Sequence, residues 1–179
     1  GDGDSDTLTD AAQDELRGAI ELHSEDAGVI MHERYMLDTI LDMDEVDLEE
    51  IMVHRKNVEM VDAEKPVREI IDQVLGSPYT RLPLWKKNPE NIIGIIHAKD
   101  MVRALIPLGG DYEKLDIGSI ALEPWFVPET TTLRSQLNAF LERKSHFALV
   151  VDEYGALMGL VTLEDILEEI VGDIADEHD

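Results

Sequence analysis

The sequence predicts an α+β fold built from two similar units that are related by pseudo-two-fold symmetry. The strings GIIHAKD at 94–100 and GLVTLED at 159–165 place a glycine and a following aspartate at the same spacing. Apolar residues at helical spacing also recur, where Val67, Ile71, Val74 and Leu75 correspond to Leu133, Leu137, Phe140 and Leu141. The chain therefore contains a sequence repeat. The number of positions that separates the two sets of apolar helical residues differs by one from the number that separates the two glycine–aspartate strings, and we call this difference the slip.

Each copy is expected to contain a helix, two strands and a second helix, in that order. After the apolar stripe comes a strand-like run, LPLW at 82–85 or FALVV at 147–151, and then turn residues. A second strand, IIGII or LMGLV, leads into the helix that follows the glycine. A short leading strand is expected near 58–61 in the first copy and near 125–127 in the second. These elements favour a mixed sheet with helices in each copy.

A single copy of about 60 residues is marginal as an independent domain, because it buries only about 60% of its unfolded surface. Two copies can cover each other's exposed sheet faces, and clefts between the two follow from that arrangement. We therefore predict three regions: an acidic N-terminal segment with a helical arm at 1–41, a first unit at 42–110 and a second unit at 111–179. Gly109 and Gly110 are interpreted as the linker between the units.

The N-terminal arm is predicted to hold two helices between 9 and 43. The opening GDGDSD is small and acidic, and it is excluded from the fold. The interrupted apolar faces of the two helices contain Leu16, Ile20, Ile30, Met36, Leu37, Ile40 and Leu41.

Composition excludes several classes of function. The net charge of −25 repels phosphate backbones and anionic lipid surfaces, so nucleic acid is not expected as a partner. The absence of cysteine rules out disulfides and thiol nucleophiles and fits a reducing compartment. No apolar run approaches the roughly 20 residues that cross a bilayer. A soluble chain in the cytoplasm is therefore expected.

Thr162 and Asp165 allow two interpretations. Their spacing, just before an apolar stripe, is typical of a helix N-cap, which needs no ligand. The start of a helix also leaves backbone N–H groups unpaired, so the same residues could accept a phosphate. Arg81 is similarly open, because an arginine beside a strand in an acidic protein is usually an ion-pair partner of a carboxylate.

Other candidate chemistry is weaker. The six histidines show no metal-ligand spacing, and the acidic face around Glu164, Glu168 and Glu169 is typical of a solvated helix surface, although it could attract magnesium. Ser145 beside His146 has no nucleophile-elbow context. A metal-dependent nucleotide hydrolase would lack an obvious base or nucleophile, so we expect no enzymatic activity and no resident metal site.

Several strings together resemble a known family. YTRLP at 79–83, FVPETT at 126–131, SHFALVVDEYG at 145–155 and TLEDILEEIVGDI at 162–174, in a duplicated β-α-β-β-α frame, look like tandem cystathionine-β-synthase (CBS) domains. More narrowly, they resemble the CorC/HlyC and cyclin-M family of magnesium transport proteins. DELRGAIELH at 14–23 and the segment 31–52 look like the region that follows the transmembrane domain of that family.

The resemblance implies a regulatory module that binds an adenine nucleotide between its CBS units. The ligand would be ATP with Mg²⁺, or ADP or AMP. Thr162 would contact phosphate and Asp165 the ribose hydroxyls, while Tyr79, Arg81 and Pro83 would contact the base and phosphates. Val53 stands where the family commonly has a threonine near the base, and His97 stands where the second copy has Thr162. Both replacements remove a hydroxyl, so one nucleotide site per chain is expected.

The resemblance also implies the surroundings of the module. It would form homodimers through its CBS units and control a membrane-embedded domain of its parent chain that transports magnesium or another divalent cation. It would then be the cytoplasmic domain of an inner-membrane or plasma-membrane protein. The alternative is a ligand-free dimerisation and scaffolding unit, in which Thr162 and Asp165 are only caps.

Overall fold

A computed structural model of the chain describes residues 12–15 and 28–172. Contacts divide the described chain into two compact units. The helical unit contains the described residues up to Met52 together with Thr130–His146 and those from Val161 onward. The sheet unit contains Val53–Glu129 and Phe147–Leu160. Each unit thus draws on both sequence copies, and the predicted boundaries 42–110 and 111–179 stay a prediction.

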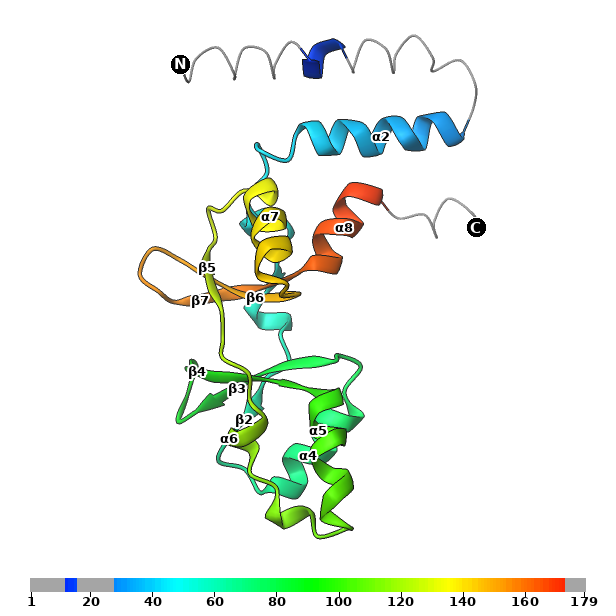
Figure 1. Ribbon diagram of the computed structural model, residues 1–179. Helices are drawn as coiled ribbons and strands as arrows, with labels where there is room; N and C mark the ends of the chain where they lie inside the picture. Colours follow the sequence, from blue (N-terminus) through cyan, green and yellow to red (C-terminus); the bar gives the residue numbers. More distant parts are fainter. Residues whose placement is uncertain (1–11, 16–27, 173–179) are drawn as a thin grey trace. The chain divides into compact units, whose positions relative to one another are not determined.

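The sheet unit holds both β-sheets (Figure 1). One is three-stranded, in the order β2-β3-β4, and the other is four-stranded, in the order β1-β7-β6-β5. Their strands are β1 (Val53–His54), β2 (Val61–Asp62), β3 (Arg81–Lys86), β4 (Asn88–His97), β5 (Phe126–Pro128), β6 (Phe147–Val151) and β7 (Leu157–Thr162), the last two residues of which belong to the helical unit. In each sheet a short leading strand, β2 or β5, lies parallel to the first strand that follows it, β3 or β6.

Helices accompany the strands in both units. The sheet unit contains α4 (Val67–Gly76), α5 (Ala98–Leu105), α6 (Ile117–Ile120) and the 3-10 helices η1 (Arg55–Asn57), η2 (Ile106–Leu108) and η3 (Tyr112–Lys114). The helical unit contains α2 (Val29–Leu41), α3 (Leu48–Ile51), α7 (Leu133–Arg143) and α8 (Leu163–Val171). The mixed fold with a helix, two strands and a helix in each copy is confirmed.

One expectation, the first leading strand, needs correction, and part of another, the N-terminal arm, lies outside the described residues. The first leading strand is shorter than predicted, because it begins at Val61 and leaves Val58–Met60 irregular. The second helix of the arm is α2, whereas Leu16 and Ile20 lie outside the described residues. The turn at Gly109, which adopts φ 58°, fits its interpretation as a linker because this left-handed conformation favours glycine.

The slip between the copies falls within a β-hairpin. The interval from the start of β3 at Arg81 to the start of α5 at Ala98 is longer by one position than the interval from β6 to α8. The first copy therefore has an extra residue between these points. Leu84 pairs with Gly94 and Trp85 with Ile92, which leaves Ile93 without an opposite residue in a β-bulge. Ile93 is accordingly exposed despite its apolar side chain.

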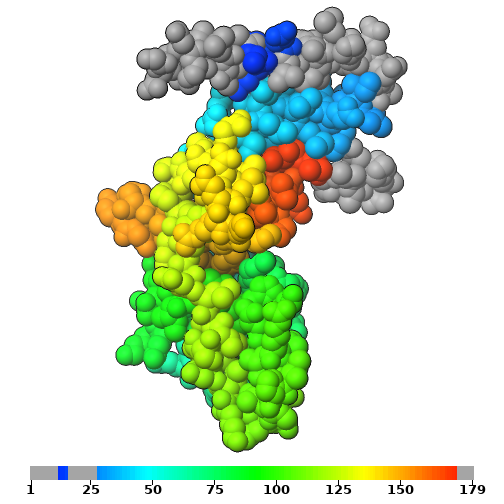
Figure 2. Space-filling view, in the orientation of Figure 1, coloured from blue at the N-terminus to red at the C-terminus, as the bar shows by residue number. Residues whose placement is uncertain are grey.

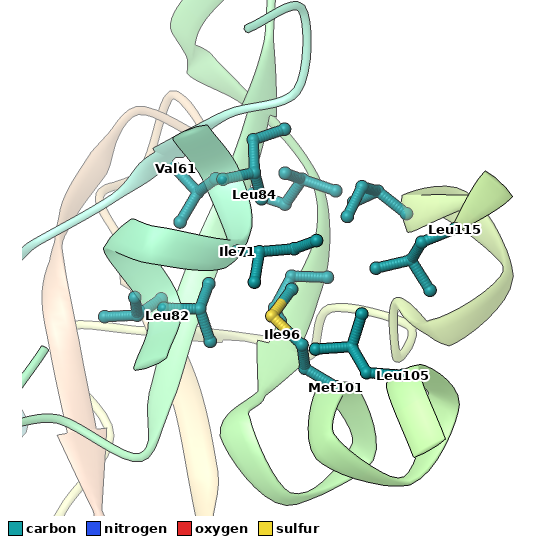
Figure 3. Packing of buried hydrophobic residues seen from close by; sticks show 11 residues of the cluster. Val61, Ile71, Leu82, Leu84, Ile96, Met101, Leu105 and Leu115 are labelled. Atoms are coloured by element: carbon teal, nitrogen blue, oxygen red, sulfur yellow. The ribbon is translucent and has the colours of Figure 1, made fainter. Parts of the chain in front are cut away.

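The core of the sheet unit lies on both faces of the three-stranded sheet. Leu82, Leu84 and Ile96 point to one face, where α4 and α5 cover them in a cluster of eleven buried residues (Figure 3). On the other face Ile92 and Ile95 pack with residues of the second copy, namely Phe147, Leu149 and Leu157. The two copies therefore cover each other's sheet faces, as the duplication predicts.

The segment that precedes each copy pairs with the hairpin of the other copy. Val53 in β1 pairs with Leu160 in β7. Leu122 forms a reciprocal bridge with Ile95 in β4, with N–O distances of 2.9 Å in both directions. Gly94 permits this bridge, because a Cβ at that position would lie 2.7 Å from the Cβ of Ala121. These two pairings, which we call the edge exchange, join the copies and were not predicted from the sequence.

Candidate functional site

Helix α8 begins with a capping box. β7 ends at Thr162, whose backbone is extended, and its Oγ1 accepts a hydrogen bond from the Asp165 N–H at 3.1 Å. The Asp165 carboxylate in turn accepts from the Thr162 N–H through Oδ2 at 3.0 Å. The cap interpretation of these two residues is therefore confirmed.

The capping box leaves polar groups free for a ligand. A hydroxyl has one donor and two lone pairs, so Thr162 Oγ1 keeps its O–H as a donor while it accepts from Asp165. The Oδ1 atom of Asp165 has no hydrogen-bond partner among the described residues. The Leu163 N–H donates to the His146 carbonyl at 2.9 Å. The Glu164 N–H has no hydrogen-bond partner in the described part of the chain. Cap and ligand site are thus compatible.

The first copy repeats this geometry with a different cap. The Ala98 N–H at the start of α5 donates to the Thr80 carbonyl at 2.8 Å, as Leu163 does to His146. His97 is the N-cap residue of α5, and its Nδ1 accepts from the Lys99 N–H at 3.0 Å. Because Nδ1 is the acceptor, a neutral imidazole carries its proton on Nε2.

Arg81 lies opposite His97 in the β3–β4 ladder. Burial and then the Arg81 guanidinium lower the pKa of His97 from its usual 6.5, which favours the neutral imidazole. Arg81 is half-buried and makes no ion pair with any carboxylate in the described part of the chain. Its guanidinium is therefore not committed to the structural role that an acidic protein would favour.

The remaining site residues differ in accessibility. Tyr79 is 55% exposed and precedes β3. Pro83 is buried in β3 opposite Ile95, at a point that β2 does not reach, so its missing N–H costs no ladder bond on that side. Val53 is partly buried in β1.

The predicted residues fall into two sets. Val53, Tyr79, Arg81 and Pro83 belong to the sheet unit, whereas Thr162 and Asp165 belong to the helical unit. Within the sheet unit the structure adds His97 beside Arg81, as a cap. Alignment of the two copies already places His97 at the position of Thr162, but histidine is not a preferred N-cap residue, so the capping role was not predicted. Among residues 12–15 and 28–172, no group of three or more His, Asp or Glu side chains is arranged to hold a metal ion.

Comparison with known families decides the identity of the fold. Residues 48–107 and 117–172 each match the CBS domain family. The chain belongs to the CBS domain family. It is a tandem CBS pair of the CorC/HlyC and cyclin-M type, as the sequence motifs indicate.

The CBS pair is similar to curated proteins, one of which is named for magnesium transport. The magnesium and cobalt efflux protein CorC of Pasteurella multocida is 36% identical over 146 residues, which cover 82% of this chain and 48% of that protein. Hemolysin C of Brachyspira hyodysenteriae is 33% identical over 82% of this chain and 53% of that protein. The chain thus spans about half the length of these curated relatives.

Two solved structures of CBS pairs contain nucleotides. The CBS domain of a bacterial CNNM/CorC family Mg²⁺ transporter in complex with ATP is 35% identical, with a TM-score of 0.73, over 79% of this chain and 99% of that one. A CBS-domain pair from Klebsiella pneumoniae with bound AMP is 38% identical, with a TM-score of 0.65, over 71% of this chain and 99% of that one.

Within residues 12–15 and 28–172, none of the helices combines the length and the apolar character that crossing a bilayer requires.

Proposed function

We propose that this CBS pair is the nucleotide-sensing module of a membrane-embedded transporter of magnesium or another divalent cation. It binds one adenine nucleotide per chain and acts as a cytoplasmic homodimer on the transmembrane domain of its parent chain. It has no catalytic role. The main support is the capping box of α8, which holds a threonine hydroxyl and one carboxylate oxygen in fixed positions without using them fully. The relatives named for magnesium transport and the ATP- and AMP-bound CBS pairs support the choice of ligand.

Each residue has a role that suits its chemistry. Thr162 O–H and the Glu164 N–H donate to phosphate oxygens, while the free Asp165 oxygen accepts from ribose hydroxyls. Arg81 binds phosphate through its guanidinium, and Tyr79 offers a ring face to the adenine. Pro83 and Val53 border the base. The neutral His97 adds no positive charge, which favours a single site.

The charges favour a magnesium complex as the ligand. ATP carries about four negative charges and approaches a chain of net charge −25. Arg81 is the only cationic side chain of the proposed set, and Glu164 follows Thr162 by two residues in the first turn of α8. Mg²⁺ would reduce the charge of the phosphates, and it prefers to be held by phosphate oxygens and water rather than by a protein cage.

Calorimetric titration of ATP with and without Mg²⁺ tests this proposal. Arg81→Gln and Asp165→Ala are each expected to weaken binding at least tenfold, whereas Lys86→Gln on the same strand as Arg81 serves as a control that leaves affinity unchanged. A double variant of Arg81 and Asp165 tests whether both contact one ligand, because residues that share a ligand give non-additive effects. The absence of heat for ATP, ADP and AMP would refute the proposal.

The second candidate function is a ligand-free dimerisation and scaffolding unit. The complete capping box favours it, since Thr162 and Asp165 already have structural partners. On this alternative, Thr162→Ala lowers the free energy of unfolding by about 1 kcal/mol, equally with and without nucleotide. If the proposed function holds, the loss is larger with nucleotide present, because the variant also forfeits part of the stabilisation by the ligand. Thr162→Ser is the matched control, because it keeps the hydroxyl.

A further inference from the structure

Helix α2 packs against α8, which follows β7, and its C-terminal end is tied to α7, which lies between β5 and β6. It packs against α8 more extensively than any other described helix packs on a helix (Figures 1 and 2). Its C-terminal end is held by Arg134 of α7, which donates to the Ile40 carbonyl at 2.7 Å and pairs with Asp44 at 2.9 Å. All of these contacts lie within the helical unit. We call this set of contacts the α2 seat.

α2 contacts the C-terminal end of α8 through Tyr35. The Tyr35 hydroxyl donates to the Glu169 carbonyl at 3.5 Å. The Tyr35 ring lies so close to Gly172 that a Cβ there would be 2.9 Å from Tyr35 Cε1. α8 has no basic residue in its last turn, so Tyr35 and the Gly172 N–H supply donors to its terminal carbonyls.

The two ends of α8 therefore carry different contacts. The capping box of Thr162 and Asp165 is at its start, and the Tyr35 contact is at its end. The helix is nine residues long, about 13 Å, without proline or glycine inside it. A helix of this length moves as one body, so a change in its position at the start also changes its contact with Tyr35.

α2 also lies outside both segments that match the CBS family, which begin at residue 48 and residue 117. A signal that leaves the CBS pair through the N-terminal arm must pass through α2. We propose that α8 couples nucleotide occupancy at its first turn to the seating of α2 at its last turn. This inference rests on the proposed function, and it adds the element that transmits the signal.

Coupling between two sites is reciprocal, so it can be measured from either side. Nucleotide bound at Thr162 and Asp165 restrains the start of α8 and is expected to slow hydrogen exchange of the α2 amides. In the other direction, loosening the α2 seat is expected to weaken nucleotide binding by about fivefold or more.

Gly172→Ala is the main variant. It places a methyl group against the Tyr35 ring and also strains the backbone, since Gly172 has φ 78°. Gly155→Ala is the matched control, because Gly155 has φ 83° but nothing within 4 Å of the added Cβ. The control carries the same kind of strain without touching α2. Tyr35→Ala removes the contact from the other side and decides the question if Gly172→Ala does not fold.

The experiment combines MgATP titration with hydrogen exchange on the wild-type chain and these variants. We expect MgATP to slow exchange in α2 of the wild type, and we expect Gly172→Ala and Tyr35→Ala, but not Gly155→Ala, to weaken MgATP binding. If the wild type binds MgATP while α2 exchange and both affinities stay unchanged, the coupling is refuted and the proposed function stands. If ATP, ADP and AMP all fail to bind the wild type, the proposed function is refuted, and the coupling with it.

Discussion

Arg81 lies directly opposite His97 where the β3–β4 ladder meets α5. After burial, the Arg81 guanidinium is the largest cause that lowers the pKa of His97. The imidazole must stay neutral to accept the Lys99 N–H through Nδ1. The cap of α5 and the charge of Arg81 therefore act in the same direction, and both favour unprotonated His97.

The lowered pKa of His97 makes stability depend on pH. Because the folded-state pKa lies below the unfolded value of 6.5, the neutral imidazole stabilises the fold fully above about pH 6.5. This contribution is lost as the pH falls through 6.5 toward the folded pKa. His97→Asn keeps an acceptor for the Lys99 N–H but does not titrate, so urea unfolding between pH 8 and pH 5 should show a smaller acid-induced loss than in the wild type.

His54→Asn is the control for this measurement. The Nδ1 of His54 accepts from the Lys56 N–H at 3.2 Å in the same kind of cap, but at an exposed position. This variant shows how much of any change comes from replacing a capping histidine as such. Equal acid-induced losses in the wild type and His97→Asn would contradict the structural assignment of His97.

Arg81 itself can be tested by nuclear magnetic resonance. Arg81→Gln removes a positive charge that disfavours protonation, so the pKa of His97 should rise. The imidazole shifts of His97 in a pH titration measure this change directly. Lys86→Gln, an exposed change on the same strand that is not among the causes of the shift, should leave the pKa of His97 where it was. An unchanged pKa in Arg81→Gln would mean that the guanidinium lies away from the imidazole.

Gly94 should be essential for the edge exchange between the copies. Gly94→Ala places a Cβ 2.7 Å from the Cβ of Ala121 and 3.2 Å from the Leu122 carbonyl oxygen. The bridge between Ile95 and Leu122 must then shift, at a cost of about 1–3 kcal/mol in the free energy of unfolding. Gly76→Ala, which meets nothing within 4 Å, should be close to neutral in the same urea titration. Equal stability of the two variants would argue against this close approach.

Gln136 is a buried polar residue that stability measurements can examine. Its side chain is 1% exposed in α7, and its Nε2 has no hydrogen-bond partner among the residues that the structure describes. Replacing an unpaired buried amide with an apolar group of similar size removes a desolvation penalty, so Gln136→Met should raise the free energy of unfolding by about 1 kcal/mol. Gln136→Glu should do the opposite, because it buries a charge. A loss of stability in Gln136→Met would show that the amide is paired in solution.

The repeat allowed most of the regular structure to be predicted. The stripes at 67–75 and 133–141 became α4 and α7, and FALVV became β6 at 147–151. Their periodicity reflects burial on one face, which a sequence records directly. Leu75 and Leu141, at corresponding places in the two stripes, are both exposed, so even the deviations repeat.

The two-residue strand β1 and the Leu122 bridge could not be predicted in this way. Val53 and Leu122 join strands that lie far from them in the sequence, and elements this short have no periodicity of their own. The cap of His97 was missed for a different reason, since histidine is not among the preferred N-cap residues. Sequence reasoning singled out Thr162 and Asp165 but left cap and ligand site open; the capping box confirms the cap, and the ligand site stays a proposal.

Amide chemical-shift mapping of the wild-type chain, titrated with MgATP, tests most directly whether one nucleotide engages both sets of residues. The account predicts saturable shifts at 79–81 and at 162–165 that share one binding curve, together with smaller shifts in α2. Saturable shifts confined to only one of the two sets, or an absence of shifts at millimolar MgATP, would contradict it.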